Sequence, residues 1–420
     1  MRKTEEVARM DFNRLVRLYG GEEPANRQLA RFEALKEHFI RHFGSADGCE
    51  LISAPGRTEI AGNHTDHNHG CVLAASVDMD TVALARKTND NRVTLYSAGY
   101  DKPFVVDVSD LTVHENEKET TLALIRGVAA EMKKAGFAVG GFEAEVSSTV
   151  MRGSGLSSSA AFEVMLVAVN DALYNGWTVD HQLNAKLSQK AENNYFLKPC
   201  GLMDQMASAV GGLVFIDFNH GDAQVEAVQY DFLKKGFIPC VVTAGGDHGN
   251  LTNEYAAIPA EMKQVARLLG GETLRDVEDK VESSIALLKG KVPDRAILRA
   301  LHFVDEDRRV REMLTALKND DLASFFDGVI ASGESSWMLL QNLFVPGGDN
   351  QEMPLALEMS RRMLTGRGAW RIHGGGFAGT ILAFVPVDLM PAYREAMDSV
   401  FGQGAVKPLY IRPEGAVWLR

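Results

Sequence analysis

The stretch Met151-Arg-Gly-Ser-Gly-Leu-Ser-Ser-Ser-Ala-Ala161 decides the fold prediction for this chain. It joins a strand-like run at residues 141–148 to an apolar, helical run that begins near Ala160. Gly153 and Gly155 let the backbone bend and bring N–H groups close to a ligand, and the positive end of the helix points at the same place. The stretch therefore predicts a cradle for an anion such as a phosphate chain. An ordinary capped helix after a glycine turn is the alternative for this segment alone.

The predicted cradle is one continuous run of small and hydroxyl-bearing residues: Gly153, Ser154, Gly155, Leu156, Ser157, Ser158 and Ser159. Serine favours the first positions of a helix, and its hydroxyl can also face a phosphate or the metal bound to it. The sequence contains no Gly-x-x-x-x-Gly-Lys-Ser/Thr motif and no complete dinucleotide fingerprint. The phosphate would therefore be held by neither a Walker nor a Rossmann loop.

Length and composition indicate a soluble protein of two domains. The chain has 420 residues, more than one hydrophobic core usually holds, so we expect domains at residues 1–215 and 216–420 with a ligand in the cleft between them. Its 44 basic and 56 acidic residues give a net charge of −12, which argues against nucleic acid or an anionic membrane as a partner. Four scattered cysteines, no signal-like N-terminus and no long apolar segment predict a cytoplasmic location. The oligomeric state is not readable from these features.

A second segment, Ala54–Gly70, carries more polar groups than a structural hairpin needs. Arg57 offers a planar cation suited to phosphate. Asn63, His64 and Asp66 offer the mixed hydrogen-bond donors and acceptors that a polyol requires. The segment therefore predicts a ligand site, with a solvated loop as the alternative.

The same segment could also form a metal site. Three histidines and one aspartate fall within six residues: His64, Asp66, His67 and His69. Their spacing fits no zinc signature, and the flanking Gly62 and Gly70 argue against a helix that would align such ligands. A metal-dependent hydrolase is therefore the less favoured interpretation.

Two carboxylates further along the chain are candidates for chemistry. Asp204 lies in Pro199-Cys-Gly-Leu-Met-Asp-Gln205, among apolar and small residues, where an unpaired carboxylate would lose its hydration. It could equally cap a helix. Glu192, twelve residues earlier on the preceding predicted helix, could bind a magnesium ion or simply lie on the exposed face of that helix.

Together these segments resemble the motifs of the GHMP kinase superfamily and, within it, of the galactokinase family. Residues 57–70 are similar to the sugar-binding signature, residues 153–160 to the phosphate loop, and residues 374–379 to the third, glycine-rich motif. The similarity extends to residues 201–205 and 243–255. It implies an α+β, two-domain GHMP kinase-like fold with the active site in the interdomain cleft. The signature and the phosphate loop would lie in the N-terminal domain and the third motif in the C-terminal domain.

The resemblance also implies the reaction and the residues that carry it. The expected activity is that of an ATP-dependent sugar 1-kinase, in the first place one that converts galactose and ATP to galactose 1-phosphate and ADP. Asp204 and Arg57 are the implied catalytic residues, with Asp204 either removing the proton of the anomeric hydroxyl or only orienting it. Ser158 and Glu192 are the implied Mg²⁺ ligands. The implied sugar-binding residues are Glu59, Asn63, His64, Asp66, Gly201 and Tyr255.

The signature departs from the family at two positions. Galactokinases typically read Arg-Val-Asn-Leu-Ile-Gly-Glu-His where this chain reads Arg57-Thr-Glu-Ile-Ala-Gly-Asn-His64, so Glu59 and Asn63 have exchanged residue types. If the two side chains are neighbours, the exchange preserves the local donors and acceptors. The alternatives are a kinase for a related sugar (an N-acetylhexosamine, a pentose or a uronic acid) and a non-catalytic paralogue that senses sugar and ATP. An extra cation facing the substrate would favour the uronic acid, and retention of the transfer residues argues against the sensor.

Overall fold

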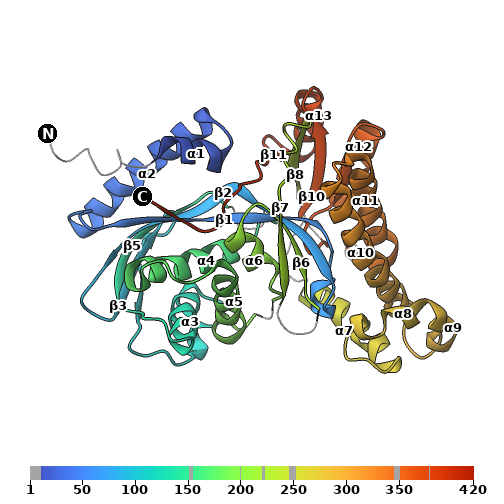
Figure 1. Ribbon diagram of the computed structural model, residues 1–420, viewed down its shortest axis with the longest axis horizontal. Helices are drawn as coiled ribbons and strands as arrows, with labels where there is room; N and C mark the ends of the chain where they lie inside the picture. Colours follow the sequence, from blue (N-terminus) through green and yellow to red (C-terminus); the bar gives the residue numbers. More distant parts are fainter. Residues whose placement is uncertain are drawn as a thin grey trace.

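The computed structural model describes residues 11–150, 155–198, 200–219, 223–245, 252–344, 351–377 and 379–420. In these residues the chain folds into a mixed α+β structure with an eight-stranded and a four-stranded sheet. Helices pack against both sheets (Figure 1). This architecture confirms the predicted fold class.

The larger sheet is built on two long antiparallel strands, β1 (Glu50–Ala61) and β2 (Cys71–Lys87). The other strands of this sheet are β3 (Arg92–Ser97), β4 (Phe104–Asp107), β5 (Phe142–Ser148), β6 (Leu213–Asp217), β7 (Gln224–Val228) and β12 (Val417–Leu419). Their order is β12-β1-β2-β5-β3-β4, with β6 paired to β2 and β7 paired to β6. The turn between β1 and β2 carries the polar residues of the predicted sugar signature.

Helices cover both faces of the larger sheet (Figure 1). One face carries α1 (Phe12–Tyr19) and α2 (Glu22–Phe43), and the other carries α3 (Thr121–Lys134), α4 (Ser158–Asn170), α5 (His181–Ala191) and α6 (Met203–Val210). Successive side chains of a strand point to opposite faces of a sheet. Accordingly, Leu51 packs with the α1 and α2 side chains, whereas Ile52 packs with those of α4. Because both faces are covered, β1 is buried almost throughout its length.

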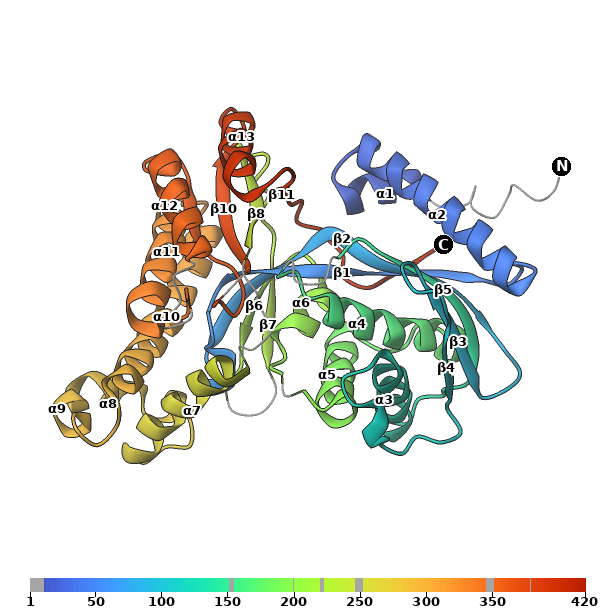
Figure 2. The same ribbon diagram turned by 180° about the vertical axis from the view of Figure 1, so that it is seen from behind.

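The smaller sheet has the order β11-β8-β10-β9. Its strands are β8 (Phe237–Gly245), β9 (Ala369–Ile372), β10 (Gly379–Pro386) and β11 (Val406–Pro408). The helices of this half are α7 (Thr252–Leu268), α8 (Glu278–Val281), α9 (Ile285–Leu288), α10 (Asp294–Lys318), α11 (Leu322–Ser335), α12 (Glu352–Leu364) and α13 (Met390–Phe401). Seen from behind, α7 to α12 lie at the end of the molecule opposite α3 to α5 (Figure 2).

Short helical turns join several of these elements. They are η2 (Asp66–Asn68), η3 (Glu115–Glu117), η4 (Asp171–Asn175), η5 (Glu192–Phe196), η6 (Leu274–Asp276), η7 (Glu282–Ser284) and η8 (Ser336–Leu340). η4, η5 and η8 are π-helical, a conformation that often occurs near functional sites.

The expected domain boundary at residue 215 falls inside β6, which pairs with β2 and with β7. The last strand, β12, also returns to the larger sheet and pairs with β1. We propose that the two parts of the chain divide between β7 and β8, with the C-terminal segment belonging to both. None of the helices in the described ranges is long and apolar enough to cross a membrane.

Candidate active site

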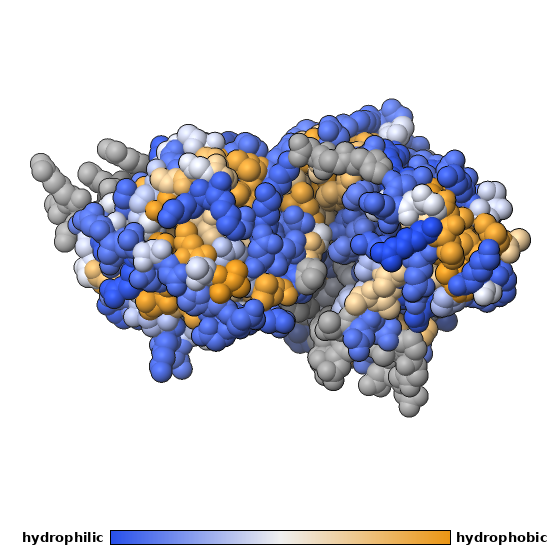
Figure 3. Space-filling model, turned by 90° about the horizontal axis from the view of Figure 1, so that it is seen from below, coloured by the Kyte–Doolittle hydropathy of each residue, from blue (hydrophilic) through white to orange (hydrophobic). Residues whose placement is uncertain are grey.

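The segments selected from the sequence meet around one cavity of about 380 Å³. Seen from below, the surface of the molecule is hollowed between its two halves (Figure 3). The lining includes Arg57 from β1, Gly155 and Ser157–Ser159 at the start of α4, Asp204 from α6 and His373–Gly376 after β9. Residues separated by more than 300 positions in the chain therefore lie around the same space.

Arg57 and Asp204 form the centre of this site. The Nε of Arg57 donates to Oδ1 of Asp204 over 2.7 Å, and an Nη1–H of Arg57 donates to the carbonyl of Gly155. The hydroxyl of Ser157 donates to Oδ2 of Asp204 over 2.6 Å. The Asp204 side chain remains 31% exposed, so its carboxylate is accessible from the cavity. The helix-cap alternative is wrong, because α6 has no side-chain cap.

Asp204 is held in its charged form. Burial by itself raises the pKa of a carboxyl, but here the Arg57 charge and the hydrogen bonds from Arg57 and Ser157 outweigh it and lower the pKa of Asp204 below its ordinary value. Asp204 is therefore ionised at neutral pH. In that form its oxygens can accept a hydrogen bond from a hydroxyl group in the cavity.

The predicted phosphate loop differs from an ordinary capped helix. Ser157 occupies the N-cap position of α4 with a left-handed φ of 57°, yet its side chain bonds Asp204 instead of capping the helix. Gly155 has a φ of 73°, and a Cβ there would lie 2.6 Å from Oγ1 of Thr380. Leu156 is fully buried, and its carbonyl accepts the backbone N–H of Arg57 at 3.0 Å. Gly153 and Ser154 lie outside the described residues.

The predicted sugar residues contact the third motif and one another. His64 donates from Nε2 to the carbonyl of Gly375 over 2.9 Å, and the hydroxyl of Tyr255 donates to the carbonyl of Gly376 over 2.8 Å. At Gly201 an added Cβ would lie 1.8 Å from Oδ2 of Asp66. Glycine at position 201 is therefore what lets Asp66 lie against this backbone.

Glu59 and Asn63 lie beneath the cavity. Nδ2 of Asn63 donates to Oε1 of Glu59 over 2.9 Å and to the carbonyl of Gly374 over 2.7 Å. Arg371 donates to Oε1 of Glu59 over 3.0 Å. Burial raises the pKa of Glu59, and the charge of Arg371 opposes that effect. Both side chains are buried, and neither contributes to the described lining of the cavity.

One of the two predicted metal ligands, Glu192, lies next to buried oxygens that have no hydrogen-bond partner. Ser158 lines the cavity, and Glu192 is only 3% exposed, so the exposed-face interpretation of Glu192 is wrong. Nε2 of Gln205 donates to Glu192 over 2.8 Å and to Glu163 over 3.1 Å. Burial raises the pKa values of both glutamates. Oε1 of Glu163 and Oε1 of Gln205 are buried without a hydrogen-bond partner, and such oxygens suit a hard cation or its water ligands.

The histidines of the signature do not assemble into a metal site. In the described ranges, no three His, Cys, Asp or Glu side chains gather closely enough to hold a metal ion. The hydrolase interpretation therefore finds no support in the arrangement of these side chains.

Sequence reasoning missed the support that α10 gives to the signature loop. Glu306 accepts the backbone N–H of Gly62 over 2.9 Å, His302 donates from Nε2 to the carbonyl of Asn63 over 2.9 Å, and Asp307 accepts the backbone N–H of Cys71 over 2.6 Å. All three side chains are buried. A signal was present: His302 and Glu306 are four residues apart and therefore share one helix face, which α10 turns inward.

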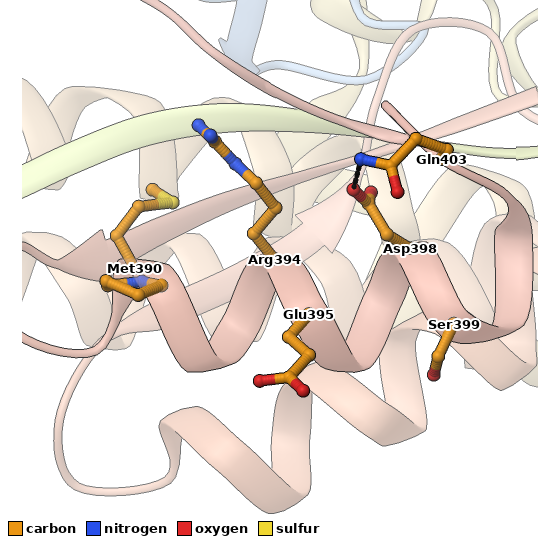
Figure 4. Close-up of a pocket in the computed structure, with 7 residues that line it drawn as sticks. Met390, Arg394, Glu395, Asp398, Ser399 and Gln403 are labelled. Atoms are coloured by element: carbon orange, nitrogen blue, oxygen red, sulfur yellow. Dashed lines mark hydrogen bonds between the residues drawn. The ribbon is translucent and has the colours of Figure 1, made fainter.

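A separate hollow of about 620 Å³ runs along α13. Figure 4 shows that Arg394 and Glu395 point to different sides of this helix, while Gln403 bonds Asp398. The charged groups therefore do not converge on one point. This hollow offers no chemistry comparable to that of the Arg57 cavity.

Comparison with known proteins agrees with this geometry. The galactokinase galactose-binding signature matches residues 37–87, and the GHMP kinases N terminal domain matches residues 123–212. The chain is 30% identical to a galactokinase of Streptomyces coelicolor over 380 residues, which are 88% of this chain and 93% of that protein.

Solved structures share the fold. The crystal structure of Lactococcus lactis galactokinase complexed with galactose superimposes with a TM-score of 0.80 at 24% identity and covers 92% of this chain and 99% of that one. Methanococcus jannaschii mevalonate kinase superimposes with a TM-score of 0.62 at 13% identity, over 89% of this chain and 99% of that one.

The match to the GHMP kinases N terminal domain, the curated relative and the shared fold define the chain as a GHMP kinase, a class of ATP-using enzymes that phosphorylate an alcohol acceptor. Within that superfamily the chain belongs to the galactokinase family. The predicted family, fold class and enzyme class are confirmed.

Proposed function

We propose that the protein transfers the terminal phosphoryl group of ATP to the anomeric hydroxyl of galactose, with Mg²⁺ as the metal. The observation that carries this proposal is the ionised Asp204, hydrogen-bonded by Arg57 and Ser157 at the edge of the phosphate loop. The carboxylate that would accept the hydroxyl proton is therefore hydrogen-bonded directly to a residue of the predicted phosphate loop.

The transfer requires little covalent chemistry from the protein. The sugar oxygen bonds to the terminal phosphorus while the bond from that phosphorus to the bridging oxygen of ADP breaks, so positioning and charge neutralisation dominate the rate. Asp204 orients the hydroxyl and receives its proton or hydrogen bond. Arg57 keeps Asp204 ionised and offsets the negative charge of the phosphoryl group.

We assign sugar binding to His64, Asp66, Gly201 and Tyr255. His64 and Tyr255 bind the backbone of the third motif, and Asp66 lies against Gly201, three residues before Asp204. Glu59 and Asn63 are buried beneath the cavity, and the hydrogen bond from Asn63 to the Gly374 carbonyl holds the signature loop against the third motif.

Ser158 and Glu192 would hold Mg²⁺, and the unpartnered oxygens of Glu163 and Gln205, which lie next to Glu192, fit its hydration shell. Bound there, the ion would neutralise charge on the phosphate oxygens. Mg²⁺ usually takes few protein ligands and completes its shell with phosphate oxygens and water, so two protein ligands suffice.

A substrate panel tests the proposal. The full chain is incubated with Mg-ATP and, separately, galactose, N-acetylgalactosamine, arabinose and galacturonic acid, with ADP release as the readout. Phosphorus NMR of the product locates the phosphate. We expect galactose to give the highest kcat/KM and a product phosphorylated at C1. A higher kcat/KM for another sugar would reassign the substrate, and binding of galactose and ATP without ADP release would identify a sensor.

A further inference from the structure

Lys198 is a second strongly basic side chain in the active-site lining, besides Arg57. It follows the π-helical turn η5 and is exposed into the same cavity as Ser158 and Asp204. Neither its sequence neighbours nor the motifs identified above assign it a role.

The backbone presents Lys198 to the cavity through an unusual turn. Leu197 has a left-handed φ of 62°, which bulky residues rarely adopt. The backbone N–H groups of Leu197 and Lys198 both point to the carbonyl of Glu192, the latter over 3.4 Å. Backbone strain of this kind persists where the surroundings fix it, and it often occurs at functional sites. The turn therefore holds the backbone of Lys198 against Glu192, the predicted Mg²⁺ ligand.

The charge of Lys198 reaches the carboxylates of the site. Burial opposes ionisation of Glu163, Glu192 and Asp204, and the positive charge of Lys198 acts in the opposite direction on all three. Lys198 lines the same cavity as Ser158 and Asp204, and it closely follows η5, which begins with Glu192. The terminal phosphate of ATP would occupy this region.

We propose that Lys198 is a further catalytic residue, whose ammonium contacts the terminal phosphate of ATP during transfer. This inference rests on the proposed kinase function. Lysine suits the task because its ammonium is a compact charge on a flexible stem and a common phosphate ligand. Together Arg57 and Lys198 would neutralise the phosphoryl group from two separate segments of the chain.

Three variants test this role: Lys198→Met, Lys198→Arg and, as a matched control, Lys133→Met. Lys133 is an exposed lysine at the end of α3, outside the cavity lining. Calorimetry gives the Kd values of Mg-ADP and of the non-hydrolysable analogue Mg-AMP-PNP, which differ by the terminal phosphate. Steady-state kinetics with varied ATP and varied galactose give kcat and both KM values, and thermal melting verifies folding.

We expect Lys198→Met to weaken AMP-PNP binding and lower kcat/KM for ATP by roughly ten- to hundredfold, the effect of losing one hydrogen bond to a charged group. ADP binding, KM for galactose and the melting temperature should match those of Lys133→Met, and Lys198→Arg should keep most of the activity.

Equal losses for ADP and AMP-PNP, or kinetics like the control, would overturn the assignment. An effect confined to KM for galacturonic acid would also overturn the assignment, because Lys198 would then bind the carboxylate of the sugar and not the phosphate of ATP. If wild type phosphorylates no sugar, the proposed function fails, but the AMP-PNP and ADP comparison still decides the role of Lys198.

Discussion

Asn63 donates a hydrogen bond from Nδ2 to Oε1 of Glu59 over 2.9 Å, and both side chains are buried. The two positions at which the signature departs from the family are therefore direct neighbours. The contact meets the condition under which the exchange would preserve the local donors and acceptors, and that preservation stays a prediction. Arg371 neutralises Glu59, and Gly374 accepts from Asn63, so the pair links the signature loop to the third motif.

Asn63→Glu alone should therefore destabilise the protein. It replaces a donor by a second carboxylate beside Glu59 and leaves the carbonyl of Gly374 unpaired. We expect a loss of about 2–4 kcal/mol in the free energy of unfolding, measured by urea denaturation. The double variant Glu59→Asn/Asn63→Glu restores one carboxylate and one amide and should recover part of that loss. Wild-type stability of the single variant would show that the pair does not support the loop.

Asp204→Asn should remove turnover while sugar binding largely survives. Asparagine keeps the size of the side chain and can still bond Ser157, but it cannot take the proton of the sugar hydroxyl and carries no charge to pair with Arg57. We expect kcat to fall by roughly 10²- to 10⁴-fold. The Kd of galactose, measured by calorimetry, should change only severalfold. Near-normal kcat would remove Asp204 from the mechanism.

Gly201→Ala should impair sugar binding through Asp66. The new methyl group would overlap Oδ2 of Asp66, at 1.8 Å, and force that side chain away. We expect KM for galactose to rise by roughly tenfold or more, with kcat and KM for ATP affected less.

A double-mutant cycle checks this cause. Asp66→Ala alone should also raise KM for galactose, and adding Gly201→Ala to it should have little further effect, because the clash no longer exists. Additive losses in the double variant would mean that Gly201 acts independently of Asp66.

The parts of the site that could be predicted are those with a strong local signal. Gly155 adopts a positive φ, and Asp204 is paired as its apolar surroundings required. The environment of Glu192 could not be predicted, because an acidic residue on a helix gives the same sequence pattern on an exposed face and on a buried one. In the structure Glu192 is buried and accepts a hydrogen bond from Gln205. The contact of His302 with Asn63 joins residues 239 positions apart, and no local pattern encodes such a pairing.

Glu306 should make stability depend on acid pH. It is fully buried, and although burial alone raises its pKa, Arg309, His302 and Arg371 lower it to about 2. A carboxyl whose folded pKa lies below its ordinary value of 4.5 contributes stability that is complete above about pH 4.5 and is lost as the pH falls toward 2. Glu306→Gln should therefore cost roughly 3 kcal/mol at pH 7, and the difference from wild type should shrink between pH 4.5 and 2. Urea denaturation across this range measures the difference.

Glu312→Gln is the control for this prediction. Glu312 lies on the same helix with 69% of its side chain exposed, so the substitution should change the free energy of unfolding by less than about 0.5 kcal/mol. Because the Oε1 of glutamine can still accept the backbone N–H of Gly62, a pH-independent difference for Glu306→Gln would contradict the lowered pKa.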